Sequence, residues 1–286
     1  MARTAAPGSG ARTTAASKAG ASKAGASKAG ARRPSRKALV ERASRITPLL
    51  AAAYPGTADE LCALRHKGPF QLLCATILSA QCTDERVNMV TPVLFKRYRG
   101  PLQLAAADRS ELEDIIRSTG FFRSKAAHLL GMSAALVDRF GPKPADFPTS
   151  MEDLTSLPGV GRKTANVVRS VALGLPGLPV DTHVLRVSRL LGLTQQTDPV
   201  KVETDLCALF PEDQWGAASL RFILHGRRIC IARRPRCEAC ILAELCPSAQ
   251  LGGPVGPKAK GRRSPVRVLQ SEETRSEEVT APVMPR

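Results

Sequence analysis

Features that would direct a chain into a membrane or into secretion are missing from this sequence. No apolar run reaches the roughly 18 residues that a membrane-spanning helix needs, and the N-terminal region has no apolar segment of the kind found in secretory signals. We therefore expect a cytoplasmic protein, associated with the nucleoid if it is bacterial. Hydrophobic residues still make up 43% of the chain, and the mean hydropathy is −0.11. These values exclude a collagen-like or fully disordered protein.

Clear alternation of apolar and polar residues, which would predict half-buried strands, is also absent. Apolar residues recur at helical spacing instead, so we predict an all-α protein with short loops. Five residues are expected to cap helices at their N-termini: Asp84, Asp108, Ser150, Asp181 and Asp198. One helix is expected from Arg162 to about Leu173, with Gly174 as its stop. Another is expected between Asp181 and Gly192.

Acidic residues are scarce relative to basic ones, and the imbalance is uneven along the chain. The chain has 42 Lys and Arg against 25 Asp and Glu, which gives a net charge of +17 and a pI near 10.1. Such an excess favours a polyanionic partner, most often nucleic acid. Residues 1–37 hold nine basic residues and no acid, whereas the central part, 38–246, carries a net charge of only +5. DNA binding by the central part therefore has to be argued from motifs.

Both ends of the chain are predicted to be disordered, as a basic N-terminal arm over 1–37 and a C-terminal tail over 248–286. Residues 16–30 repeat the pentapeptide ASKAG, in which regular glycines disfavour a helix and no apolar face is formed. The arm could be a solvated linker, a non-specific attractor of DNA phosphates, or a transit peptide. The tail is rich in Gly, Pro and charged residues.

A glycine-rich string, LPGVGRKTA at residues 157–165, joins two helical patterns. Two glycines separated by one residue permit a very tight turn. The free N–H groups at the start of the next helix then form an anion site together with the helix dipole. A plain corner between helices is the alternative, but the flanking residues make the string resemble a helix-hairpin-helix motif, which grips the DNA backbone without reading bases. The expected DNA contacts are Gly159, Val160, Gly161, Arg162 and Thr164.

Lys163 is the candidate nucleophile of this string. Residues 38–246 contain only six lysines, and the rest of their positive charge comes from arginine, which cannot act as an amine nucleophile. Lys163 lies in the first turn of its helix, where the dipole disfavours the ammonium form and so favours the amine that forms a Schiff base. A phosphate contact is the alternative. Asp181 could be a helix cap, and it could also accept a proton from Lys163 or stabilise a cationic sugar, with His183 hydrogen-bonded nearby.

The eight cysteines fall into two groups. Four are scattered among helical residues and are predicted to be buried free thiols: Cys62, Cys74, Cys82 and Cys207. Four lie in one short segment with the spacing C-x6-C-x2-C-x5-C, which predicts a metal site: Cys230, Cys237, Cys240 and Cys246. The spacing leaves zinc and a [4Fe–4S] cluster open, although a single C-x2-C pair leans toward iron and sulfur. Arginines in and beside this segment, Arg233 among them, predict a second contact with the DNA backbone.

Three stretches together resemble the endonuclease III family of base-excision DNA glycosylases. They are LSAQCTDERVN at 78–88, LPGVGRKTANVV at 157–168 with VDTHVLRVSRLLGL at 180–193, and the four-cysteine segment at 230–246. The resemblance covers roughly residues 38–247 and implies a two-domain helix-hairpin-helix DNA glycosylase fold with a DNA cleft between the domains. A six-helix barrel would occupy 62–174. A second domain would combine 38–61 with 175–247 around a [4Fe–4S] cluster, so the resemblance, and not the spacing, decides iron over zinc.

The resemblance also implies a reaction on double-stranded DNA with damaged bases or abasic sites. A damaged nucleotide is flipped into the cleft, and Lys163 attacks the sugar C1′ and expels an oxidised or ring-saturated pyrimidine. Asp181 takes the amine proton and stabilises positive charge on the sugar, and the Schiff base permits β-elimination 3′ to the lesion. Gln81 matches the glutamine that fills the gap in the duplex, and Asp84 a polar residue of the same loop. Phe121 stands where leucine is common at a wedge, with packing in the core as the alternative.

Two other readings account for part of this pattern. An adenine-mismatch glycosylase of the same superfamily shares the hairpin, the aspartate and the cluster, but it normally lacks the lysine and carries a large C-terminal recognition domain. A non-catalytic DNA-binding protein would use the hairpin, the metal segment and the tails for affinity alone. The combination of Lys163 with Asp181 favours a monomeric, bifunctional DNA glycosylase and abasic-site lyase over both.

Overall fold

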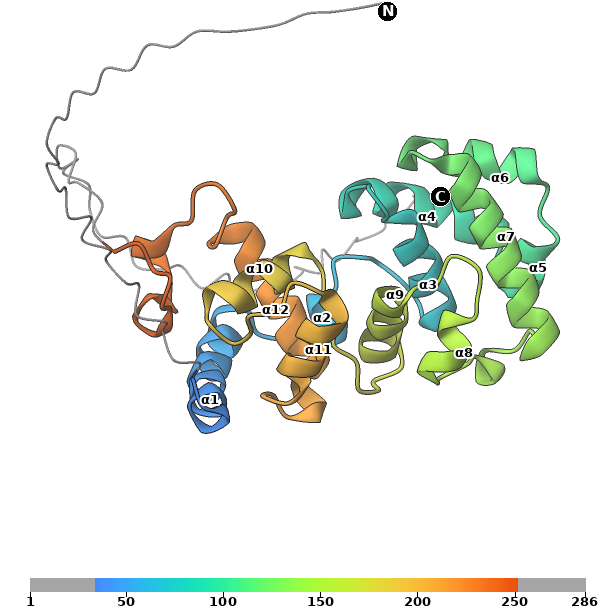
Figure 1. The fold of residues 1–286 in the computed structure, drawn as a ribbon. Helices are drawn as coiled ribbons and strands as arrows, with labels where there is room; N and C mark the ends of the chain where they lie inside the picture. The colour runs from blue at the N-terminus through green and yellow to red at the C-terminus, as the bar shows by residue number, and fades with distance from the viewer. Residues whose placement is uncertain (1–33, 252–286) are drawn as a thin grey trace, which may run out of the picture.

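The computed structural model describes residues 34–251, and this range is helical without any β-strand, as predicted (Figure 1). The α-helices within it are α1 (Arg36–Ala53), α2 (Ala58–Leu61), α3 (Pro69–Leu78), α4 (Asp84–Arg97), α5 (Pro101–Ala105), α6 (Arg109–Ile116), α7 (Phe122–Arg139), α8 (Met151–Thr155), α9 (Arg162–Val167), α10 (Thr182–Leu190), α11 (Pro199–Cys207) and α12 (Trp215–Arg228). Short 3-10 turns lie between them, including η1 (Arg117–Thr119), and one π-helical segment, η3 (Val168–Ala172), follows α9. In residues 34–251 no helix is both long and apolar enough to cross a bilayer.

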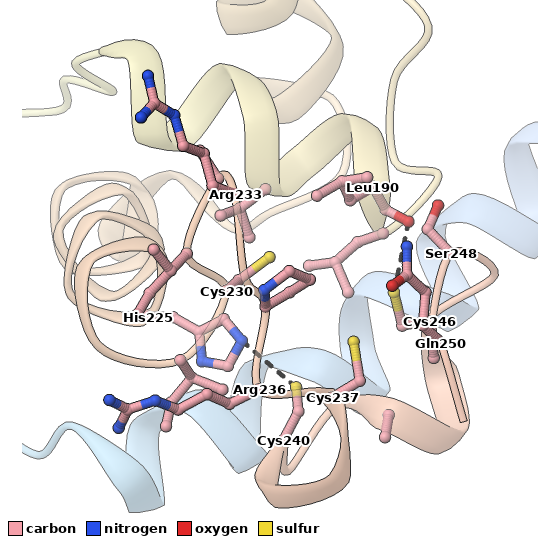
Figure 2. Close-up of a pocket in the computed structure, with 18 residues that line it drawn as sticks. Leu190, His225, Cys230, Arg233, Arg236, Cys237, Cys240, Cys246, Ser248 and Gln250 are labelled. Carbon is pink, nitrogen blue, oxygen red and sulfur yellow. Dashed lines mark hydrogen bonds between the residues drawn. The ribbon is translucent and has the colours of Figure 1, made fainter. Parts of the chain in front are cut away.

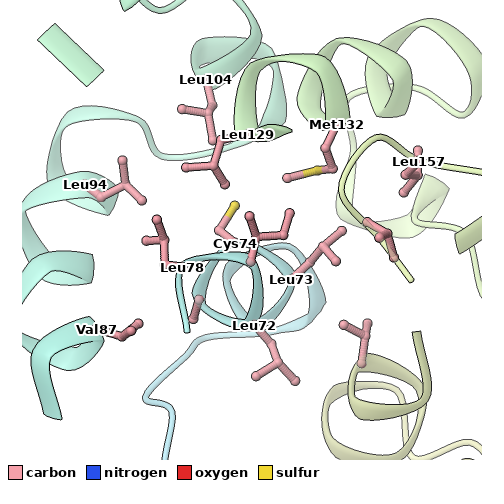
Figure 3. Close-up of a cluster of buried hydrophobic side chains, with 14 of the residues drawn as sticks. Leu72, Leu73, Cys74, Leu78, Val87, Leu94, Leu104, Leu129, Met132 and Leu157 are labelled. Atoms are coloured by element: carbon pink, nitrogen blue, oxygen red, sulfur yellow. The ribbon is translucent and has the colours of Figure 1, made fainter. Parts of the chain in front are cut away.

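Buried apolar side chains between residues 64 and 171 form what we call the first core. Its centre is α3, in which six of the ten residues are buried. Figure 3 shows Leu72, Leu73 and Cys74 of this helix pointing in different directions toward side chains of the surrounding helices, among them Leu94 and Met132. A helix that is apolar on all sides is expected at the middle of a helical bundle, and α3 is enclosed accordingly.

A second core is assembled from two distant parts of the chain. Buried residues of α1 and its C-cap, 43–54, pack together with buried residues between 178 and 242. In Figure 1 the blue helix α1 lies beside the orange helix α12, and these two helices are in contact. α12 also contacts η3 and α2, so it lies where the two cores meet.

The predicted helix caps are formed by short-range hydrogen bonds. Asp108, Ser150 and Asp198 each accept a bond from the backbone N–H three residues further on, at 2.8, 3.0 and 3.0 Å. Asp181 caps α10 by accepting from the N–H groups two and three residues further on. The predicted helix over 162–173 is present as α9 followed by η3. The N–H of Leu173 bonds to a carbonyl five residues back, the π-helical spacing that the sequence pattern did not reveal.

Three boundaries and three burial states differ from the prediction. Thr83, and not Asp84, caps α4, because its hydroxyl accepts from the N–H of Arg86 and places Asp84 in the first turn. The chain is already helical from Arg36, inside the predicted arm. The structure also describes residues 248–251 of the predicted tail, and the remaining expectations for the arm and the tail lie outside the described residues. Among the four scattered thiols only Cys74 is buried, and the others are half-buried.

Candidate active site and DNA interface

The two glycines of the hairpin meet different surroundings. Gly159 has a φ of +77°, and a Cβ there would lie 2.7 Å from Cβ and Cγ of His128, so only glycine fits. Gly161 has a φ of −93°, and a Cβ there would meet nothing within 4 Å. The chain therefore presents bare backbone to solvent at Gly161. Between the glycines, Val160 is buried and its N–H donates to the carbonyl of Leu157 at 3.1 Å, so this residue holds the turn to the first core.

Helix α9 begins directly after the hairpin and has no side-chain cap. Its N-cap, Gly161, has no side-chain oxygen to accept from the N–H groups of the first turn, so these donors and the positive end of the helix dipole stay available to an anion. Lys163 is exposed in this turn and makes no hydrogen bond or ion pair with residues 34–251. Its neighbour Arg162 instead donates through Nε and Nη2 to both carboxylate oxygens of Glu203, at 2.8 Å each. Lys163 thus has a side chain without a partner in this range, next to an arginine that is paired. Thr164, the next residue, is half-buried.

Asp181 is held firmly at the start of α10. Its Oδ1 accepts from the backbone N–H groups of His183 and Val184 at 2.8 Å each, and its Oδ2 lies 3.1 Å from Nδ1 of His183. The Asp181 side chain is 13% exposed and that of His183 is 28% exposed. The imidazole therefore fixes the second carboxylate oxygen while leaving it within reach of solvent.

The structure does not join the two predicted catalytic groups by a bond. In the described residues the carboxylate of Asp181 is bonded within its own helix turn, and Lys163 has no partner. The segment leading to Asp181 nevertheless packs on α9, because a Cβ on Gly177 would lie 2.7 Å from the backbone oxygen of Asn166. The amine of Lys163 and the carboxylate of Asp181 therefore lie on segments that pack together, but they form no ion pair with each other.

Gln81 and Phe121 share a backbone conformation that non-glycine residues seldom adopt. Within residues 34–251 they alone among non-glycine residues have a positive φ, 53° and 49°. The left-handed region costs such residues about 1–2 kcal/mol, and strain of this kind concentrates at functional positions. Both side chains are exposed, and Phe121 is 67% exposed, which argues against core packing.

Two ion pairs connect elements of the first core to elements of the second. Asp84 of α4 accepts from Nη1 of Arg227 of α12 at 2.8 Å. The pair of Arg162 with Glu203 joins α9 to α11 in the same way, and its bonds raise the pKa of Arg162. Both predicted DNA contacts, Asp84 and Arg162, therefore act as links between the two halves of the protein in this structure.

The four clustered cysteines surround a cavity of about 220 Å³, and Figure 2 shows them around this space, with the sulfur of Cys240 hydrogen-bonded to His225 and that of Cys246 to the carbonyl of Leu190. The donors around the cavity are four cysteine thiols, the ligand set that a [4Fe–4S] cluster takes and that structural zinc can also take. Burial raises the pKa of the Cys230, Cys240 and Cys246 thiols, and a bound cationic centre would favour their thiolate forms.

His225 and Arg186 contact the cysteine segment through hydrogen bonds. His225 is 2% exposed, with Nε2 at 3.5 Å from Sγ of Cys240 and Nδ1 at 3.4 Å from the hydroxyl of Tyr54. Burial lowers the pKa of His225 to about 4, so the ring is neutral at pH 7. Arg186 donates to the backbone carbonyl of Cys230 at 2.8 Å. Arg233 lines the same cavity wall and is exposed.

Comparisons with known proteins agree with this geometry. The model of the HhH-GPD superfamily of base excision DNA repair proteins matches residues 74–212, and that of the iron-sulfur binding domain of endonuclease III matches residues 230–246. A Synechocystis protein named Endonuclease III is 52% identical over 73% of this chain and 94% of its own length. The chain belongs to the endonuclease III family. The Endonuclease III of Bacillus subtilis is 44% identical over 66% of this chain and 85% of its own length.

Solved structures of Endonuclease III bound to DNA have the same fold. A non-covalent Endonuclease III–DNA complex matches with a TM-score of 0.67 and 41% identity, over 73% of this chain and 96% of that one. A trapped Endonuclease III–DNA covalent intermediate matches with a TM-score of 0.67 and 40% identity, over 76% of this chain and 97% of that one.

Membership of the endonuclease III family decides between the readings that the sequence left open. The protein is a bifunctional DNA glycosylase and abasic-site lyase of base excision repair, and it binds DNA. Its cofactor is a [4Fe–4S] cluster, which the four cysteines around the cavity would hold, and not a zinc ion. The adenine-mismatch and non-catalytic alternatives are thereby set aside.

The sequence did not reveal several residues that hydrogen-bond to the predicted site residues. His183 was expected only to hydrogen-bond nearby, and it holds the second oxygen of Asp181. Its position two residues after a capping aspartate is a local signal. Glu203 is 41 residues from Arg162, and His225 is 15 residues from Cys240. No spacing rule connects those pairs.

Proposed function

We propose that this enzyme removes oxidised or ring-saturated pyrimidines from duplex DNA through the amine of Lys163. The amine attacks C1′ of the flipped nucleotide, the bond between C1′ and the base breaks, and Asp181 accepts the amine proton. The sugar ring opens to a Schiff base. Loss of a C2′ proton then expels the 3′ phosphate by β-elimination, and water hydrolyses the imine to release the enzyme.

The state of Lys163 carries this proposal. It is exposed and unpaired at the start of α9, whereas the adjacent Arg162 is fully engaged with Glu203. A lysine kept only for phosphate binding would be interchangeable with arginine, but an amine that forms a Schiff base is not. The carboxylate of Asp181 is oriented by His183 and is partly exposed, which supports its role as the proton acceptor.

We further propose which domain each core forms and which segments contact DNA. The first core would correspond to the six-helix barrel domain over 62–174, and the second to the cluster domain formed by 38–61 and 175–247. The hairpin at Gly159 and Gly161 and the arginine-rich cysteine segment would grip the phosphate backbone, and Gln81 and Phe121 would enter the duplex. The enzyme would work as a monomer in the cytoplasm, associated with the nucleoid if the source is bacterial, with the basic arm adding salt-sensitive affinity.

The test is borohydride trapping on a duplex with one abasic site, comparing the wild type with Lys163→Ala and Lys163→Arg. Lys163→Arg preserves the positive charge for DNA affinity but has no nucleophilic amine, and Lys201→Ala, on the exposed surface of α11, is the control for loss of an unrelated lysine. We expect a trapped adduct with the wild type and Lys201→Ala only. An adduct with Lys163→Arg would place the nucleophile elsewhere. Duplexes carrying a ring-saturated thymine or an oxidised purine then test the substrate class.

A further inference from the structure

Lys125 of α7 is a buried lysine that the reaction does not use. Its side chain lies in the first core with 4% of the residue exposed. The Nζ donates to the carbonyl oxygens of Leu78 and Thr119, at 2.8 Å each, and no carboxylate among residues 34–251 pairs with it. Burial lowers the pKa of Lys125. Burying an ammonium group costs free energy, which its hydrogen bonds have to offset.

The two carbonyls belong to the segments that lead into the probing loops, by which we mean the loops that carry Gln81 and Phe121. Leu78 is the last residue of α3, three residues before Gln81, and Thr119 is the last residue of η1, two residues before Phe121. Carbonyls at helix C-termini lack intrahelical partners and carry the negative end of the dipole. One cation therefore ties together two helix ends that are 41 residues apart in the chain.

The side chain of Lys125 starts next to the wedge position. The N–H of Lys125 donates to the carbonyl of Phe121 at 3.1 Å, the first helical bond of α7, so the lysine stem leaves the helix one turn after Phe121. Beyond the two carbonyls that Lys125 binds, both loops are strained, since Gln81 and Phe121 have left-handed backbone angles. Such angles persist only where the surroundings over-determine them. The clamp made by Lys125 supplies that constraint.

We propose that Lys125 is a positioning residue that fixes the two probing loops relative to each other, so that Gln81 and Phe121 enter the duplex as one unit. The inference rests on the proposed function. A lysine suits this task because three N–H donors on a flexible stem reach two carbonyls from different helices. It does not touch the reacting sugar, so its effect is confined to substrates whose base stack must be opened.

The experiment compares two substrates in borohydride trapping: a single-stranded abasic-site oligonucleotide and the same strand in a duplex. The single strand has no stack to open, so Lys125→Met should be trapped on it within about twofold of the wild-type rate, and should fall about 10- to 100-fold on the duplex. 2-Aminopurine opposite the abasic site provides a second readout, because its fluorescence rises when the base is unstacked. We expect that rise to shrink in Lys125→Met. Lys96→Met, an exposed lysine on α4, is the matched control.

Each outcome decides the inference. Equal trapping losses on both substrates, or no loss on the duplex, would overturn it. If Lys125→Met does not accumulate as folded protein, Lys125→Arg takes its place: it keeps the charge but alters the donor geometry, and the same split between substrates is expected at smaller size. Absence of trapping by the wild type on both substrates would instead refute the proposed function. In a double-mutant cycle, Phe121→Ala should cost less on the duplex in the Lys125→Met background than in the wild type.

Discussion

Replacing Gly161 by alanine separates what the hairpin does for folding from what it does for DNA. The residue has an extended conformation that alanine adopts readily, and a Cβ there meets nothing within 4 Å. The same change at Gly159 forces alanine to a φ of +77° and places its Cβ 2.7 Å from His128. The two glycines are therefore required for different reasons, although they look equivalent in the sequence.

The expected magnitudes follow from these surroundings. Gly161→Ala should change the free energy of unfolding by less than about 1 kcal/mol, because restriction of the unfolded chain by alanine is opposed by the lower preference for alanine at the N-cap of α9. A methyl group at the open backbone would obstruct a charge-assisted hydrogen bond to phosphate worth about 2 kcal/mol, which corresponds to about a 30-fold rise in Kd. Gly159→Ala should lose about 2–5 kcal/mol of stability, from the left-handed backbone and from overpacking.

Fluorescence anisotropy with a duplex that carries a stable abasic-site analogue measures the Kd, and urea unfolding measures stability. The slope of log Kd against log salt should be the same for Gly161→Ala and the wild type, since no cation is removed. Wild-type affinity in folded Gly161→Ala would refute the phosphate contact. A stability loss in Gly161→Ala as large as that of Gly159→Ala would refute the reasoning about open space.

Other parts of the structure give further expectations. Phe121→Ala should change the free energy of unfolding by less than about 0.5 kcal/mol, because the ring is 67% exposed, yet lower duplex trapping about tenfold through lost stacking; a large drop in the urea midpoint would contradict it. The pKa of Glu111 is lowered, chiefly by the hydrogen bond from Arg97 and next by that from Tyr98. The advantage of the wild type over Glu111→Gln should therefore hold above the ordinary glutamate value of 4.5 and disappear as the pH falls below it; parallel urea midpoints from pH 7 to 3 would exclude this. Cys237→Ser should abolish the visible absorbance of the cluster and weaken DNA binding while most of the far-ultraviolet circular dichroism remains, and retained absorbance would show that Cys237 is not a ligand.

Short-range chemistry explains why much of the helical framework could be predicted. A capping side chain bonds to the N–H three residues on, so Asp108, Ser150 and Asp198 are visible in the sequence. The same logic placed the α4 cap one residue late, because Thr83 and Asp84 are both competent caps and only one side chain faces the helix end. The glycine hairpin and the cysteine segment were equally local, and both are where the motifs put them.

The parts that sequence reasoning missed depend on contacts between distant residues. Arg162 and Glu203 are 41 residues apart, and Asp84 and Arg227 are 143 apart. Nothing in either neighbourhood indicates the partner. The pairing changes how two predicted DNA contacts are understood, since Asp84 and Arg162 already link the two halves. Lys125 could be counted in the sequence, but its burial and its two carbonyl partners follow only from the fold.

The second core is built from both ends of the described chain, and this sets an order for assembly during synthesis. The first core comes from one continuous stretch, so all its parts are available once residue 171 has emerged from the ribosome. Helix α1 emerges before them, but its partner α12 is complete only about 170 residues after Tyr54. At about 5–20 residues per second, α1 waits about 9–35 s with Ile46 and Leu50 uncovered. The four clustered cysteines all follow α12 in the chain, so they are synthesised only after the partner of α1, and a nascent chain that stops short of α12 would expose the apolar face of α1 to chaperones.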